Sequence, residues 1–149
     1  MFNKNRNRSG FTIIELLLVI AIMTVTLSIM IPVSTDYQKR NDLDLAQTTF
    51  AQSVRRAQQL SMASDGDSQW GVATDSINGN IVVYKGATFI GRDTSFDENY
   101  DLSKAITVSG QSEYDFTKLL GSTTSGTVTF TNGNYVKNVS VNVKGIVNY

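Results

Sequence analysis

Hydrophobic residues dominate one long stretch near the start of the chain. Residues 11–33 read FTIIELLLVIAIMTVTLSIMIPV, and Glu15 is the only charged residue among them. A helix of this length spans about 34 Å, whereas the hydrocarbon core of a bilayer is roughly 30 Å thick. A soluble core helix this long normally keeps a polar stripe. The pattern therefore predicts a single transmembrane helix.

The hydrophobic pattern changes after Pro32. Apolar residues now recur at steps of three and four, which is typical of one face of an amphipathic helix. The positions are Leu43, Ala46, Phe50, Val54, Ala57 and Leu60. Residues 34–36 offer an N-cap, so Pro32 either separates two helices or kinks one helix that runs from Phe11 to about Ser64. Gly66 is the expected C-terminal stop.

The remainder of the chain alternates short β-type runs with turn residues. The predicted strands are residues 69–74, 80–85, 88–90, 105–108, 113–117, 126–131 and 135–144. Asn78-Gly79 and Asn132-Gly133 are strong hairpin signals. Consecutive hairpins predict an antiparallel sheet, and the apolar helix face is its expected cover. The expected fold is therefore α+β, with Trp70, Tyr84, Phe116 and Phe130 in the core.

Composition narrows the possible chemistry. The 149 residues include no cysteine and no histidine, which excludes disulfides, thiolate or imidazole metal sites and imidazole general bases. We therefore predict neither an enzyme nor a cofactor. Lys+Arg and Asp+Glu are 13 each, but Lys4, Arg6 and Arg8 precede the apolar stretch. This basic start predicts a cytoplasmic N-terminus. The rest of the chain has 10 basic and 13 acidic residues, a balance of −3 that argues against a broad nucleic-acid-binding surface.

The carboxylate of Glu15 needs an explanation, because an acidic residue at the centre of a membrane span costs about 2.5–3.5 kcal/mol. Cleavage between Gly10 and Phe11 would create an α-ammonium group four residues before Glu15, on the same helix face. The ammonium group of the same or a neighbouring chain would then neutralise the carboxylate. The apolar run is too long for a secretory signal peptide, and no small-x-small cleavage site follows it. A plain signal anchor remains the alternative.

Residues 10–16, with the sequence GFTIIEL, resemble the class III prepilin signal of type IV pilins and type II secretion pseudopilins. The resemblance implies that prepilin peptidase cleaves after Gly10, that Phe11 is N-methylated, and that Glu15 docks each subunit in a filament. Pro32 lies where many members carry a helix-kinking proline. The implied divisions are a leader (1–10), a membrane and filament-core helix (11–33), an amphipathic helix (34–65) and a β-rich head (66–149). One difference is that the chain has no glycine between Gly10 and Gly66.

The resemblance also implies partners and a location. The partners would be other pilin or pseudopilin subunits, prepilin peptidase and an inner-membrane assembly platform. The subunit would cross the inner membrane once, with its head extracytoplasmic, before it joins a pilus or pseudopilus. Ala57 lies late in the predicted helix, WGV at residues 70–72 opens the predicted sheet, VVY at residues 82–84 forms a strand, and residues 126–130 are followed by residues 139–145. In these features the C-terminal half resembles pseudopilin H and FimT-type minor pilins, which favours a minor subunit.

Other functions were weighed against this interpretation. A major pilin is one alternative, and a competence minor pilin that binds DNA through Arg55, Arg56, Lys137 and Lys144 is another. A membrane-anchored enzyme has no supporting residue set.

Three further sets of residues were considered as sites. Asp93, Asp97 and Asp101, with Glu98, are candidates for calcium within residues 91–102, which otherwise read as a solvated loop. Glu113 and Asp115 share one face of a predicted strand but lack any accompanying catalytic motif. The glycosylation-type triplet at residues 138–140 falls inside a predicted strand.

Overall fold

The computed structural model describes residues 10–149, apart from the side chains of residues 29–33. The chain forms two compact units, Met1–Tyr37 and Gln38–Tyr149. Helix α1 (Ile13–Met62) contributes to both of them, and its backbone stays helical through position 32. The side chain of Pro32, for which a kink was predicted, lies outside the described residues, as do residues 1–9 of the predicted leader.

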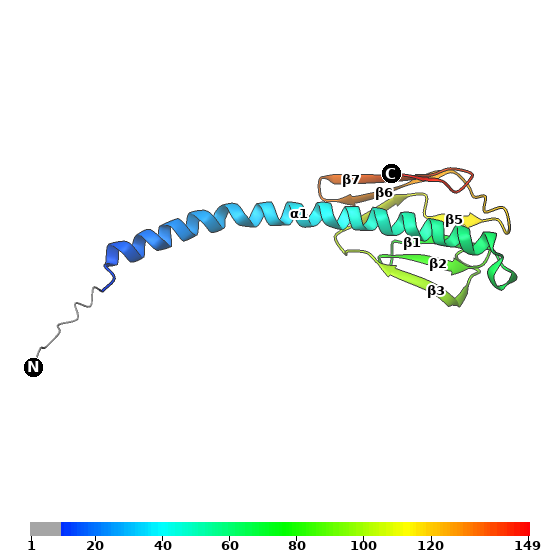
Figure 1. The fold of residues 1–149 in the computed structure, drawn as a ribbon, viewed down its shortest axis with the longest axis horizontal. Helices are drawn as coiled ribbons and strands as arrows, with labels where there is room; N and C mark the ends of the chain where they lie inside the picture. Colours follow the sequence, from blue (N-terminus) through cyan, green and yellow to red (C-terminus); the bar gives the residue numbers. More distant parts are fainter. Residues whose placement is uncertain (1–9) are drawn as a thin grey trace, which may run out of the picture. The chain divides into compact units, whose positions relative to one another are not determined.

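The second unit, here called the head, contains the second half of α1, a short 3-10 helix η1 (Asp65–Asp67) and eight strands. The strands are β1 (Trp70–Asp75), β2 (Asn80–Lys85), β3 (Asp93–Asp101), β4 (Thr107–Gly110), β5 (Glu113–Phe116), β6 (Gly126–Asn132), β7 (Tyr135–Val141) and β8 (Val147–Asn148). They form two antiparallel four-stranded sheets, ordered β3-β2-β1-β5 and β4-β6-β7-β8. Figure 1 shows β1, β2 and β3 on one side of α1 and β6 and β7 on the other.

The apolar face of α1 covers both sheets, as its periodicity predicted. The ring of Phe50 makes edge-to-face contacts with Tyr114 of the first sheet and Phe130 of the second, at centroid distances of 6.0 and 5.7 Å. The residues Leu43, Ala46, Phe50, Val54 and Ala57 are all buried in this core, and Leu60 is partly buried against it. Trp70, Tyr84, Phe116 and Phe130 are buried too, which confirms their predicted place in the core.

The structure corrects three details of the predicted head. The predicted single sheet is two sheets, and residues 88–90 form no strand. Conversely, residues 91–102 are not a solvated loop, because most of them form β3. This strand is an edge strand with little buried surface, so it lacks the apolar alternation by which a strand is recognised in a sequence.

Candidate functional site

The predicted cleavage junction is accessible. Gly10 and Phe11 are both exposed, immediately before α1 begins. A Cβ atom built on Gly10 would meet no other atom within 4 Å, so the described fold places no steric demand for glycine there. The junction is therefore open to a protease, and the requirement for glycine at position 10 would come from that protease.

Glu15 lies in the first turn of α1. The hydroxyl of Thr12, the residue before the helix, accepts a hydrogen bond of 3.3 Å from the backbone N–H of Glu15. Thr12 is thus the N-cap, and Glu15 occupies the third helical position of a Thr-x-x-Glu capping sequence. A carboxylate is favoured near a helix N-terminus by the helix dipole. The same geometry brings Glu15 within one turn of the new N-terminus that cleavage after Gly10 would create.

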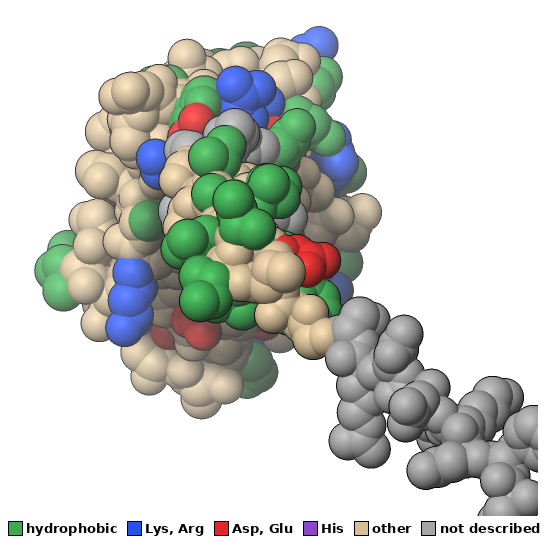
Figure 2. Space-filling model, turned by 90° about the vertical axis from the view of Figure 1, so that its left-hand side faces the viewer, with side chains coloured by type: hydrophobic (Ala, Val, Ile, Leu, Met, Phe, Trp, Pro, Cys, Tyr) green, Lys and Arg blue, Asp and Glu red, His purple; other side chains and the backbone are tan. Residues whose placement is uncertain are grey.

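Apolar side chains cover the N-terminal part of α1 and contact little else in the chain. Residues 13–28 are exposed throughout, and Figure 2 shows hydrophobic side chains gathered on this part of the helix. The hydroxyls of Thr24, Thr26 and Ser28 donate to backbone carbonyls three or four residues earlier, at 2.7–2.9 Å. This segment therefore presents an apolar surface on which these three hydroxyl groups are satisfied by the helix itself, as a helix buried among apolar partners requires. Within the described residues, no helix combines the length and the apolar character needed to cross a membrane.

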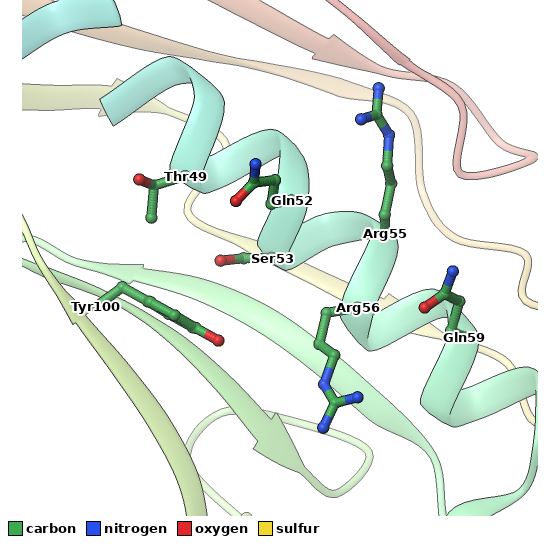
Figure 3. Close-up of a pocket in the computed structure, with 7 residues that line it drawn as sticks. All are labelled: Thr49, Gln52, Ser53, Arg55, Arg56, Gln59 and Tyr100. Atoms are coloured by element: carbon green, nitrogen blue, oxygen red, sulfur yellow. The ribbon is translucent and has the colours of Figure 1, made fainter. Parts of the chain in front are cut away.

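A polar groove of about 390 Å³ runs between α1 and β3 in the head. Its lining comes from the residues Thr49, Gln52, Ser53, Arg55, Arg56 and Gln59 of α1 and Tyr100 of β3 (Figure 3). Arg56 forms an ion pair of 3.0 Å with Glu98, and the Tyr100 hydroxyl donates to the same carboxylate at 3.1 Å. Two of the groups that line the groove, Arg56 and Tyr100, therefore share Glu98 as a partner, and Arg55 adds a second arginine to the lining.

Two of the four candidate DNA-binding cations have acidic partners within the head. Arg55 and Arg56 point away from each other in Figure 3, and Arg56 is paired with Glu98. Lys137 forms an ion pair of 3.0 Å with Asp44 of α1. Phosphate binding by these residues would require several cations on one surface. The ion pairs of Arg56 and Lys137 therefore reduce the positive charge that these two residues could offer to phosphates.

The structure does not bring the calcium candidates together. Asp93, Asp97 and Asp101 lie four residues apart along β3, so the outer two are separated by about 26 Å of extended chain. Asp97 instead accepts two hydrogen bonds from the Arg92 guanidinium, at 2.8 and 3.1 Å. Across the part of the chain that the structure describes, no three acidic side chains are placed to share a metal ion.

Glu113 and Asp115 do lie together, but in a structural cluster. Both accept contacts from the Tyr84 hydroxyl, and Glu113 also accepts the backbone N–H of Phe89. Burial raises the pKa of Asp115, and burial with the neighbouring carboxylates raises the pKa of Tyr84. The cluster pins residues 86–92 to the outer face of the first sheet. The spacing of the two acids along one strand indicated their shared face, but nothing local indicated Tyr84.

Comparison with known proteins gives two independent results. The model of the prokaryotic N-terminal methylation motif matches residues 5–31. The fold resembles two structures of the minor pseudopilin EpsH from the type 2 secretion system of Vibrio cholerae, each with a TM-score of 0.54. Sequence identity is 11% and 10%, over 72% of this chain and 94% and 92% of those chains. No curated protein matches the sequence.

The motif match and the fold likeness are consistent with each other. The motif accounts for the exposed junction and the apolar segment behind it, and the fold likeness covers most of the remaining chain. Together they show that the chain carries an N-terminal methylation motif and has a fold like that of a minor pseudopilin.

Proposed function

We propose that this protein is a minor subunit of a type IV pilus-like or type II secretion filament. The observation that carries the proposal is the accessible Gly10-Phe11 junction, followed by a capped helix whose apolar surface is exposed. The likeness of the head to a minor pseudopilin favours the minor class over a major pilin.

The proposed mechanism is physical. Residues 11–33 hold the precursor in the inner membrane with its head outside the cytoplasm, and prepilin peptidase removes residues 1–10. The Phe11 α-ammonium, with a reference pKa of about 7.7–8.0, is largely charged at neutral pH even before its methylation. Glu15 then pairs with that ammonium group on a neighbour, because either charge would be costly to bury unpaired in an apolar bundle. An inner-membrane platform would drive this transfer from lipid to filament.

Glu15 is well placed for this role. It belongs to the first turn, and its backbone is fixed by the Thr12 cap. Its carboxylate is therefore presented at a defined height on the helix. A neighbour whose N-terminus arrives at that height is selected over one in another register, since any other register buries an unpaired charge.

Mass spectrometry of sheared native filaments tests the proposal. We expect a peptide that begins with N-methylated Phe11, at low abundance relative to the most abundant subunit. The same peptide at high abundance would identify a major pilin instead. If only chains that begin near Met1 were found, and only in membranes, the filament proposal would be wrong and a plain anchor would stand.

A further inference from the structure

Strand β3 has one side on which no other strand of the described chain pairs. It lies at the end of the first sheet and pairs only with β2. With nine residues it is the longest strand of the head. A long exposed edge strand is a template for pairing with another extended chain. Natural sheets often protect such edges with short strands, proline or lysine, and β3 has none of these.

The register of β3 shows which backbone groups face its free side. The N–H of Leu102 donates to the carbonyl of Gly79 at 2.9 Å, in the same register that pairs β3 with β2. In an antiparallel ladder, every second residue makes both of its bonds with the neighbouring strand, and the residues between them point the other way. The backbone groups of Tyr100 therefore face β2, whereas those of Asn99 and Asp101 point to the free side. These groups can bond an added strand.

A groove, here called the edge groove, follows β3 along α1. The polar groove of about 390 Å³ continues into a second hollow of about 300 Å³, and both are lined by Thr49 and Tyr100 (Figure 3). Along α1 the edge groove extends from Asp42 to Gln59, which is about 26 Å or the length of about eight residues of extended chain. A strand added to β3 would point alternate side chains into this groove.

The two ends of the edge groove differ in charge. Asp42 and Asp101 line one end, where no basic residue takes part. Arg55 and Arg56 line the other end, where no acidic residue takes part. Arg56 pairs with Glu98, but Asp42, Asp101 and Arg55 form no ion pair within the part of the chain that the structure describes. Asp42 and Arg55 are about 20 Å apart along the helix, which corresponds to about six residues of a strand.

We propose that the edge groove binds a flexible, extended segment of a protein outside the filament, which adds to β3 as a further strand. The charges of the groove suit a segment with a basic and an acidic residue about six positions apart, on one face of the strand. A second copy of β3 does not suit it, because β3 has four acidic residues and no basic one, and like charges on paired strands repel.

The size of the edge groove also indicates the kind of partner. One short segment makes a contact far smaller than the interfaces of permanent complexes, and such small contacts are typical of transient binding. The backbone of the segment would supply affinity, and its alternate side chains would supply specificity. The inference goes beyond the proposed filament function and does not depend on it.

Amide hydrogen exchange measured by NMR tests strand addition. The full-length chain in detergent is mixed with the synthetic peptide KTVTVTET, in which threonine and valine favour a strand and the two charges are about six residues apart. With peptide at about ten times its Kd, we expect the amide protons of Asn99 and Asp101 to exchange about tenfold more slowly. The amide proton of Tyr100 is the internal control, because it already faces β2, and its exchange should change far less. Absence of binding, or unchanged exchange at Asn99 and Asp101, would overturn the proposal.

Variants of Asn99 separate backbone pairing from side-chain contacts. Asn99→Pro removes an N–H on the free side and leaves the bonds with β2 in place, so the peptide should bind at least about fivefold more weakly. Asn99→Ala is the matched control, because it keeps the N–H and should bind as the parent does. Thermal unfolding of both variants checks that the head is folded. Equal binding by the two variants would contradict strand addition.

Two further measurements test the charges and the partner. The peptides KTVTVTKT and ETVTVTET should bind about threefold more weakly than KTVTVTET, and equal binding would overturn the charge match. Asn99→Pro should be recovered in filaments as often as the parent chain. Its exclusion from filaments would place the occupant of the edge groove among the filament subunits and overturn the partner proposed here, while the filament function itself would stand.

Discussion

At the scale of single residues, the backbone conformation of Leu119 lowers the stability of the fold. Its φ of 68° is accessible to glycine at no steric cost, whereas other residues lose about 1–2 kcal/mol there. We expect Leu119→Gly to raise the free energy of unfolding by about 1 kcal/mol, since little buried surface is lost. Urea unfolding of the full-length chain in detergent measures this change. Leu120→Gly is the control, because Leu120 has no positive φ, and it should be neutral or destabilising.

A second residue-scale prediction concerns Asp115. Burial raises the pKa of its carboxyl group above 3.8, so the folded state binds more protons than the unfolded state between 3.8 and the folded pKa. Stability is therefore lost as the pH rises through that window, and the deficit persists at neutral pH. Asp115→Asn keeps an acceptor for the Tyr84 hydroxyl and removes the charge. We expect the variant to be more stable than the parent at pH 7 and to lose that advantage below pH 4.

Asp93→Asn provides a control of opposite sign for the Asp115 measurement. Hydrogen bonds from Ser95 lower the pKa of Asp93, so its charged form is the stabilised one. Neutralising Asp93 should not stabilise the head at pH 7. A gain in both variants would mean that general charge reduction, and not the burial of Asp115, is responsible.

At the scale of elements, the two halves of α1 do different work. Glu15 lies in the half whose surface is exposed. We expect the Glu15→Ala variant to be cleaved normally. Its recovery in filaments should fall at least about tenfold, which corresponds to about 1.4 kcal/mol. The variant lacks the carboxylate that would pair with a neighbour's α-ammonium group, and that group would then enter the apolar bundle unpaired. Quantitative immunoblots of membrane and filament fractions measure the ratio. Asp101→Ala, an exposed acid on β3, is the control, and equal loss in both variants would remove the docking role.

The second half of α1 holds the head together through Phe50. This ring contacts aromatic residues of both sheets and is fully buried. We expect Phe50→Ala to lower the free energy of unfolding by about 3–5 kcal/mol through lost contacts and a cavity. Leu45→Ala, on the same helix but 63% exposed, should change it by less than about 0.5 kcal/mol. Thermal unfolding of both variants measures the two changes. Comparable losses of stability in Phe50→Ala and Leu45→Ala would show that the core does not depend on Phe50.

The same elements show what the sequence could predict. The buried face of α1 and the alternation of strand β6 follow local periodicity, so both could be predicted from the sequence. Gly10, Phe11 and Glu15 belong to a linear motif, which a sequence shows directly. Strand β3 could not be predicted, because its polar residues are ordered by long-range partners such as Arg56 for Glu98. The edge groove was hidden for the same reason, since it joins segments that are far apart in the sequence.

At the scale of the whole molecule, the proposed processing site and the folded head lie in different units, and glycines at two positions can test whether the two are independent. Gly10 has open space around it, whereas a Cβ atom on Gly71 would lie 2.4 Å from the Tyr84 ring inside the head. We expect Gly10→Val to leave the unfolding curve of the head unchanged and to accumulate as uncleaved precursor that begins near Met1. Gly71→Val should instead destabilise the head by several kcal/mol through overpacking while its leader is still removed. Intact-mass spectrometry with thermal unfolding of each membrane-extracted chain measures both properties. Loss of head stability in Gly10→Val would show that the two units are coupled, and cleavage would then have to be understood together with folding of the head.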